Sequence, residues 1–204
     1  MSDYSYQLNL FGEPEPLRRE HDFYATPFEC VEAIKPVLDS IYNVPDLEAR
    51  WLEPCAGDGA IMRHVSKVIT PRYPIIWDAY EIRDTIIDPG SALIKTNATC
   101  HNFLADPSAD HYDVCLTNPP FKNWESFLFA CWNYCEDIIF LLPLSALGGK
   151  KRRDLYQEFP LSGLYILAAR PSFTGDGATD SMVYAWFHWT PRRLHDGSIK
   201  FGVF

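Results

Sequence analysis

The sequence predicts an α/β fold with a mostly parallel sheet covered by helices on both faces. Short apolar segments typical of strands alternate along the chain with segments of helical periodicity. Residues 138–142 are almost wholly apolar, as in parallel strands that are buried on both sides. The 204 residues, of which 47% are hydrophobic, suffice for one well-buried domain and are few for two.

The first two segments are an irregular arm and a helix. Residues 1–20 are rich in Pro, Glu and Tyr without periodicity, so we expect an N-terminal arm followed by a single domain over residues 21–204. Thr26 and Glu29 have the spacing of a capping box, and Pro27 suits the first helical position. These signals predict a helix that runs to about residue 40.

Strands and helices then alternate to the end of the domain. Apolar periodicity, glycine turns and prolines define these elements. In chain order, we expect a strand at 51–52, a helix at 60–69, a strand at 75–81, a weak helical segment at 85–94, strands at 95–99 and 113–117, a helix at 124–135, and strands at 138–142, 164–168 and 182–189.

Composition limits the possible settings of the protein. No apolar stretch approaches the roughly 20 residues that a membrane-spanning helix needs, and the first residues do not resemble a secretory signal. The six cysteines form no C-x-x-C pair and no spacing typical of zinc sites. We therefore expect a soluble, cytoplasmic protein with free thiols and no metal. Cys131 and Cys135, one helical turn apart, are a conceivable metal pair, but packing in the core is the favoured interpretation.

The net charge of −9 argues against a broad phosphate-binding surface. Local basic clusters are nevertheless present, at residues 150–153 within a predicted loop at 148–158, and at Arg170, Arg192 and Arg193. A solvated surface and a phosphate contact are equally compatible with each of these residues.

Asn118, Pro119, Pro120 and Phe121 directly follow the predicted strand at 113–117. The Asn118 side-chain oxygen and the Pro119 carbonyl can accept the two N–H groups of a planar amine, which directs the nitrogen lone pair toward an electrophile. Proline fixes φ and donates no competing N–H, and Phe121 can stack on a planar base. The alternative is a strand end followed by a proline turn.

A second informative site is the turn E-P-C-A-G-D-G at residues 53–59. Its small residues allow backbone to approach a ligand, and N–H groups at the start of the next helix can face an anion or carboxylate. The spacing is not G-x-G-x-x-G, so a pyrophosphate cradle is not indicated. Glu81 ends the next predicted strand, where a carboxylate can accept both hydroxyls of a ribose.

Together, these motifs resemble the S-adenosylmethionine-dependent methyltransferases of the Rossmann-like class, which have a mostly parallel seven-stranded sheet. Asn-Pro-Pro followed by an aromatic residue is the signature of members that act on amino nitrogens, above all adenine N6 in DNA. Residues 22–27, D-F-Y-A-T-P, resemble the motif that precedes the glycine turn in adenine methyltransferases. Residues 170–174 and 184–186 are similar to small enzymes carried by bacteriophages and prophages. The resemblance spans about residues 21–189.

The resemblance implies S-adenosyl-L-methionine as the cofactor and assigns residues to it. These are Phe23, Tyr24 and Thr26 at the methionine end, Glu53, Ala56, Gly57 and Gly59 along the methionine and ribose, Glu81 at the ribose, and Ile82, Asn102 and Phe103 around the adenine ring. Asn102 stands where the family often has Asp, but its amide still provides an acceptor oxygen.

The resemblance also implies a substrate and a mechanism. Asn118 to Phe121 would hold the amine without a general base, and an adenine in duplex DNA would be flipped out at a cost of about a few kcal/mol. We expect Lys122, Lys151, Arg152 and Phe173 to contact the substrate, with Phe173 or a neighbour in the loop at 171–180 as the wall opposite Phe121. A loop that is only mobile is the equal alternative.

We expect no separate recognition domain. Recognition would then come from residues 1–20, from residues 148–158 or from a second subunit, or be absent, and the oligomeric state stays open. The alternative functions are methyl transfer to adenine in RNA or to a protein glutamine, and a non-catalytic cofactor-binding module.

Overall fold

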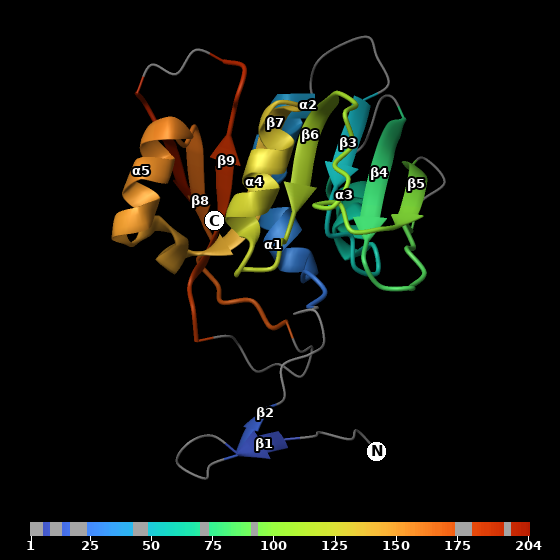
Figure 1. Cartoon of the computed structure of the whole chain (residues 1–204), viewed down its shortest axis with the longest axis horizontal. Coiled ribbons are helices and arrows are strands. Elements are labelled where there is room, and N and C mark those ends of the chain that lie inside the picture. Colours follow the sequence, from blue (N-terminus) through green and yellow to red (C-terminus); the bar gives the residue numbers. More distant parts are fainter. Residues whose placement is uncertain are drawn as a thin grey trace.

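The computed structural model describes residues 6–8, 14–16, 24–42, 49–69, 74–90, 94–173, 181–193 and 197–204, and it confirms the α/β fold class. Its main sheet (Figure 1) contains β3 (Ala49–Glu53), β4 (Ile75–Glu81), β5 (Ile94–Cys100), β6 (Tyr112–Thr117), β7 (Cys135–Pro143), β8 (Gly163–Ile166), β9 (Tyr184–Trp189) and β10 (Lys200–Val203). The strand order is β10–β8–β9–β7–β6–β3–β4–β5.

The sheet is mostly parallel. Strands β5, β4, β3, β6 and β7 all run in the same direction, whereas β9 is antiparallel to β7 and β8. The expected count of seven strands is one too low, because β10 pairs in parallel with β8 at the edge of the sheet. Phe201 and Val203 of β10 are exposed, so this strand lacks the buried apolar pattern on which strand prediction depends.

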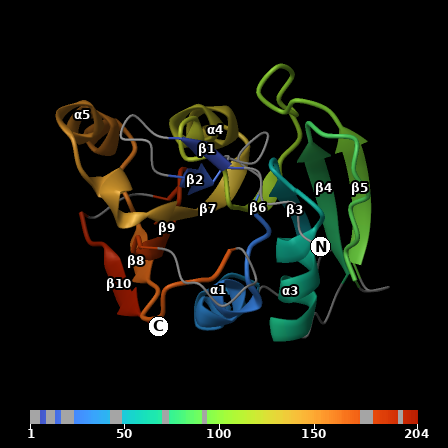
Figure 2. The same cartoon turned by 90° about the horizontal axis from the view of Figure 1, so that it is seen from below.

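Helices cover both faces of the sheet. They are α1 (Phe28–Ala33), α2 (Lys35–Tyr42), α3 (Ala60–Val68), α4 (Trp124–Trp132) and α5 (Lys150–Glu158), with a short 3-10 helix at Leu144–Leu147. Figure 2 shows α1 and α3 on one face and α4 and α5 on the other. Val114 and Leu116 of β6 belong to the core on the α1 and α3 side, whereas Cys115 between them packs on the α4 side. This alternation is that of a strand buried on both faces.

The predicted first helix is wrong in two details. The structure divides it at Ile34 into α1 and α2, and Pro36 explains the break, since a proline fits the first turn of a helix but not its interior. The N-cap of α1 is Pro27 rather than Thr26, and no side chain caps the helix. The Thr26 hydroxyl instead contacts Asn118.

Three further element predictions need correction. Residues 85–90 are irregular rather than helical, because the Asp88 N–H donates to the Asp58 carbonyl and draws this segment over the glycine turn. The helix predicted at 124–135 ends at Trp132, and Cys135 already belongs to β7. The basic segment expected as a loop forms α5.

The described part of the first 20 residues is a small sheet of its own. It consists of β1 (Tyr6–Leu8) and β2 (Pro14–Pro16), which pair antiparallel. The division into an arm and a single domain stays a prediction. Among the described helices, none combines the length and the apolar character needed to cross a membrane.

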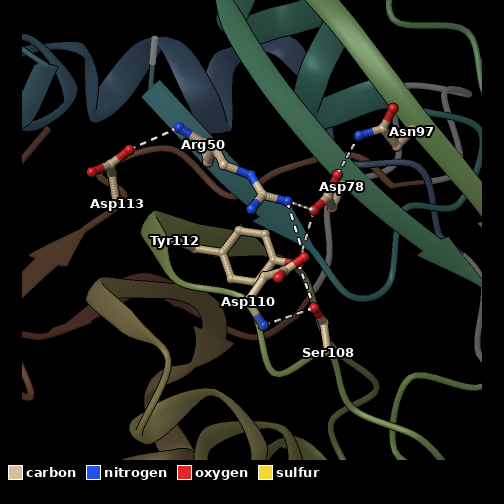
Figure 3. A network of polar contacts seen from close by, with 7 residues as sticks. All are labelled: Arg50, Asp78, Asn97, Ser108, Asp110, Tyr112 and Asp113. Atoms are coloured by element: carbon tan, nitrogen blue, oxygen red, sulfur yellow. Dashed lines mark hydrogen bonds and ion pairs between the residues drawn. The ribbon is translucent and has the colours of Figure 1, made fainter. Parts of the chain in front are cut away.

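A polar network connects four strands of the sheet (Figure 3). The Asp78 carboxylate on β4 accepts hydrogen bonds from Arg50 Nη2 at 2.7 Å, from Asn97 Nδ2 at 2.7 Å and from the Tyr112 hydroxyl at 2.9 Å. Arg50 also pairs with Asp110 at 3.1 Å. The network therefore ties β3, β5 and the start of β6 to one carboxylate on β4.

Candidate active site

The carboxyl ends of three neighbouring strands bring the predicted site residues together. β3 lies between β4 and β6 and is parallel to both. Glu53 is the last residue of β3, Glu81 is the last of β4, and Asn118 directly follows β6. The chain order runs outward from β3 through β4 to β5 on one side, and through β6 to β7 on the other. The edge beside β3 and β6 is thus a topological switch point, where open α/β sheets bind ligands.

The glycine turn after β3 depends on backbone conformations that favour glycine. Gly57 has a φ of 59° and Gly59 a φ of 84°. A Cβ atom on Gly59 would lie 2.7 Å from the Asp88 carbonyl oxygen, so only glycine allows the 88 segment to lie this close. The Ala56 N–H donates to the Tyr80 carbonyl at 2.8 Å, which attaches the turn to β4.

Glu81 organises the turn through both of its carboxylate oxygens. Oε2 accepts the Gly57 N–H at 2.8 Å, while Oε1 accepts the backbone N–H of Arg83 at 3.0 Å and its Nε at 2.8 Å. Burial alone would raise the pKa of Glu81, but the hydrogen bonds and charge of Arg83, with the Gly57 N–H, bring the pKa below its ordinary value. Glu81 is therefore held as a carboxylate on which one lone pair, on Oε2, is left for a further hydrogen bond. Arg83 was not predicted as a site residue, although its place two residues after Glu81 in the sequence was a usable signal.

Glu53 is also a buried carboxylate, but it lacks the hydrogen bonds that Glu81 accepts. It is 1% exposed, and among the described residues neither carboxylate oxygen has a hydrogen-bonding partner. Burial raises the pKa of Glu53 well above its ordinary value, the neighbouring Thr117 hydroxyl opposes that shift, and the charge of Glu81 adds to it. A buried carboxylate without a partner is unfavourable, so the site is complementary to a cationic donor.

Some polar groups of the N-P-P-F motif form hydrogen bonds within the protein, and others remain available at the carboxyl ends of the strands. Asn118 Nδ2 donates to the Thr26 hydroxyl oxygen at 3.2 Å. The Pro120 carbonyl accepts the Asn123 N–H at 2.9 Å at the start of α4. No other described residue hydrogen-bonds to the Asn118 amide oxygen or to the Pro119 carbonyl. The two acceptors predicted to hold an amine are thus the two left available.

Four aromatic rings lie next to this motif. Phe121 lies 5.8 Å from Tyr184, Tyr184 lies 5.1 Å from Phe173, and Phe173 lies 6.3 Å from Tyr24, measured between ring centroids. Tyr24, Phe121 and Phe173 are partly exposed. Tyr184 is buried at the start of β9, and it connects the motif to the segment that contains Phe173. Phe173 is thus connected to Phe121 through Tyr184, and its role as the wall opposite Phe121 stays a prediction. Residues 174–180 of the predicted loop lie outside the described part of the chain.

The residues predicted around an adenine ring lie in different surroundings. Ile82 follows β4 directly and is 51% exposed, as a platform for a planar ring requires. Asn102 is exposed, but its amide oxygen accepts the Leu104 N–H at 3.1 Å and so closes its own turn. Phe103 is buried between Tyr80 and Phe127. Phe23 lies outside the described residues.

The predicted substrate-binding cations are of two kinds. Lys122 and Lys151 are exposed. Arg152 is tied into the protein, because its guanidinium donates to Glu125 at 3.0 Å and to the Ser145 carbonyl at 2.9 Å, and lies over the ring of Trp124. Arg152 thus anchors α5 to α4.

Three cysteines form a buried cluster. The sulfur atoms of Cys115, Cys131 and Cys135 lie within 4.8 Å of one another, and the Cys115 and Cys131 sulfurs are 3.7 Å apart. All three belong to the apolar core on the α4 side of the sheet. That they pack as core side chains without a metal stays a prediction.

No protein-family model and no curated protein sequence matches this chain, whereas solved structures share its fold. A methyltransferase subunit of a type I restriction-modification system from Streptococcus thermophilus has a TM-score of 0.69 at 12% identity, over 88% of this chain and 47% of its own. A candidate class I S-adenosylmethionine-dependent methyltransferase from Listeria monocytogenes has a TM-score of 0.67 at 11% identity, over 93% and 68%.

A candidate RNA methyltransferase from Pyrococcus horikoshii is also similar, with a TM-score of 0.61 at 13% identity, over 83% of this chain and 88% of its own. The chain therefore has the Rossmann-like class I methyltransferase fold. It spans less than half the length of the Streptococcus subunit and about two thirds of that of the Listeria protein.

Proposed function

We propose that this protein is an S-adenosylmethionine-dependent methyltransferase that acts on the N6 amino group of adenine in DNA. One observation carries the proposal: at the same switch point, the structure combines a buried carboxylate without a partner, Glu53, with two available amine acceptors, Asn118 Oδ1 and the Pro119 carbonyl. The shared fold supports the choice of cofactor.

The residues at the ends of β3 and β4 fit this cofactor. Glu53 would accept the methionine ammonium, which supplies the cationic donor that its buried carboxylate lacks. The remaining lone pair of Glu81, on Oε2, would accept one ribose hydroxyl, and Ile82 would pack on the adenine ring. Tyr24 would lie near the sulfonium as a cation–π partner. When bound, the cofactor supplies a methyl group on a positively charged sulfur.

The Asn118 motif holds the nucleophile. Asn118 Oδ1 and the Pro119 carbonyl accept the two N–H groups of the amine, so that its lone pair faces the methyl carbon. Methyl transfer to this nitrogen would break the carbon–sulfur bond of the cofactor, leave the bonding pair on the sulfur and release one proton from the nitrogen to water. Because the electrophile is already activated, no His or Asp base is needed.

The rings beside the motif favour a nucleobase as the acceptor. Phe121 provides a stacking surface, and the rings of Phe173 and Tyr24 are connected to it through Tyr184. Stacking on aromatic side chains offsets the cost of removing a base from a duplex, about a few kcal/mol. We propose the cytoplasm of a bacterium that carries a phage or prophage as the setting.

The test of this function is a transfer assay with methyl-labelled cofactor. The protein is incubated separately with unmethylated DNA, with RNA and with a protein extract, and the labelled product is identified. Label recovered as N6-methyladenine in DNA supports the proposal. Label found only in RNA adenine or in protein glutamine would change the assigned substrate but not the type of reaction. Bound cofactor without any transfer would indicate a non-catalytic module.

The Asn118→Ala variant tests the assignment of the motif. We expect it to reduce transfer by at least about 100-fold, since it removes one of two acceptors that act on the reacting nitrogen. Cofactor affinity, measured by calorimetry, should stay within about threefold of wild type, since Asn118 would contact the amine and not the cofactor. A large loss of cofactor binding would instead show that Asn118 maintains the fold of the crevice.

A further inference from the structure

We propose that Thr26 is a positioning residue for methyl transfer: its hydroxyl oxygen holds the Asn118 amide in the orientation that presents Oδ1 to the substrate amine. This inference rests on the proposed function. It gives Thr26 a role other than that of a helix cap or a border of the cofactor. The two residues are 92 positions apart in the sequence, and the fold brings them to a distance of 3.2 Å between Asn118 Nδ2 and Thr26 Oγ1.

A carboxamide has two different ends, and only one of them suits this reaction. With Oδ1 toward the substrate, the amide accepts an N–H of the amine. Turned by 180°, it would direct its own NH₂ at an amine that also donates, and the acceptor would be lost. The productive orientation turns the Asn118 NH₂ into the protein, where it needs an acceptor because unpaired polar groups are costly there. Thr26 Oγ1 is that acceptor.

The surroundings of Thr26 fix its hydroxyl in place. The residue is 4% exposed. It precedes Pro27, whose carbonyl accepts the Cys30 N–H in the first turn of α1. The His64 ring of α3 packs against the ring of Phe28, the first residue of α1, with 5.5 Å between the ring centroids. Thr26 therefore cannot move away from Asn118 without disturbing α1 and α3, and it can act as a rigid stop for the amide.

Tyr24 adds a second connection between the same segment and the acceptor side of the site. Its ring meets the edge of Phe173, which in turn contacts Tyr184 beside Phe121. The segment before α1 thus reaches the acceptor site through one polar and one aromatic contact. Of the two, only the contact of Thr26 is directional, so Thr26 is the residue that selects the orientation of the amide.

Two substitutions separate this role from a packing role. Thr26→Val keeps the shape of the side chain and removes the acceptor, whereas Thr26→Ser keeps the hydroxyl and removes a methyl group. We expect Thr26→Val to lower kcat by about 10- to 100-fold, as small misplacements of a reacting group do. We expect Thr26→Ser to stay within about threefold of wild type, and both variants to keep cofactor affinity within about threefold.

A double-variant comparison gives a readout that packing cannot produce. In Asn118→Asp the two carboxylate oxygens are equivalent, so there is no wrong end to present. If Thr26 selects an orientation, Thr26→Val should reduce the rate of Asn118→Asp by a much smaller factor than that of wild type. Ser66→Ala is the control, since it removes a half-buried hydroxyl that donates to the Arg63 carbonyl on α3.

The outcomes separate the inference from the function on which it rests. Wild-type protein that methylates no amine in DNA, RNA or protein would overturn both. An active wild type with an equally active Thr26→Val variant would overturn the inference alone. So would equal losses in Thr26→Val and Thr26→Ser, a fall in cofactor affinity that matches the fall in rate, or the same loss in the Asn118→Asp background.

Discussion

The ionisation of Glu53 links the stability of the protein to its proposed ligand. Because its pKa is raised in the folded state, the native protein binds more protons than the unfolded chain at pH values above the ordinary value of 4.5. The contribution of Glu53 to the free energy of unfolding therefore decreases as the pH rises from 4.5 toward the raised pKa. Glu81 has a lowered pKa and acts in the opposite sense, since its contribution is lost as the pH falls below 4.5.

Substitution Glu53→Gln should separate these effects. The neutral amide removes the buried charge, so thermal unfolding from about pH 5 to about pH 8 should show a growing advantage of the variant over wild type without cofactor. Cofactor affinity should fall by about 10- to 100-fold, as expected for the loss of a charge-assisted hydrogen bond. A variant that matches wild type in both pH profile and affinity would contradict both roles of Glu53.

Substitution of Gly59 tests why the turn needs glycine. The cause is either the close approach of the Asp88 carbonyl or the positive φ alone. Gly59→Ala adds a Cβ at 2.7 Å from the Asp88 carbonyl at a φ of 84°, and we expect a loss of stability of about 1–3 kcal/mol. Gly197→Ala is a matched control, because Gly197 has a φ of 82° and no atom within 4 Å of the new Cβ. Urea unfolding of both variants measures the difference, and equal losses would show that the Asp88 contact is unimportant.

At the scale of helices and strands, sequence patterns predict the elements that are buried. They fail for features that depend on contacts between elements. The strands β4, β6 and β7 were predictable because burial on one or both faces leaves an apolar pattern. The edge strand β10 leaves none, because Phe201 and Val203 remain exposed. Glu53, Glu81 and Asn118 could be placed together because parallel topology gathers strand ends at one edge. The Thr26 contact could not, because it depends on where α1 packs.

The network around Asp78 is the polar connection between strands in Figure 3, and its removal should be costly. Asp78→Ala leaves Arg50, Asn97 and Tyr112 without their shared acceptor, so we expect a loss of about 2–4 kcal/mol in urea unfolding. The control is Lys35→Ala, which breaks an exposed pair with Asp39 on α2 and should cost about 0.3–0.5 kcal/mol. Similar losses in both variants would mean that the network contributes no more than a surface pair.

At the scale of the whole molecule, a net charge of −9 requires that any binding of nucleic acid be local. The structure divides the cations of α5 by what they contact. Arg152 is engaged with Glu125 and Ser145, whereas Lys151 is exposed. A phosphate contact is therefore expected of Lys151, and a stabilising contact between helices of Arg152.

Salt dependence distinguishes these two roles. Lys151→Ala should weaken DNA binding and reduce the slope of log affinity against log salt by about 1, because one phosphate contact fewer releases one counterion fewer. Arg152→Ala should lower the thermal midpoint and leave the slope unchanged. Lys67→Ala on α3, across the sheet from α5 in Figure 2, is the control for a change of net charge. Binding followed by fluorescence anisotropy over a salt series gives all three slopes. If Lys67→Ala changed the slope as much as Lys151→Ala, the attraction would come from the whole surface rather than from α5.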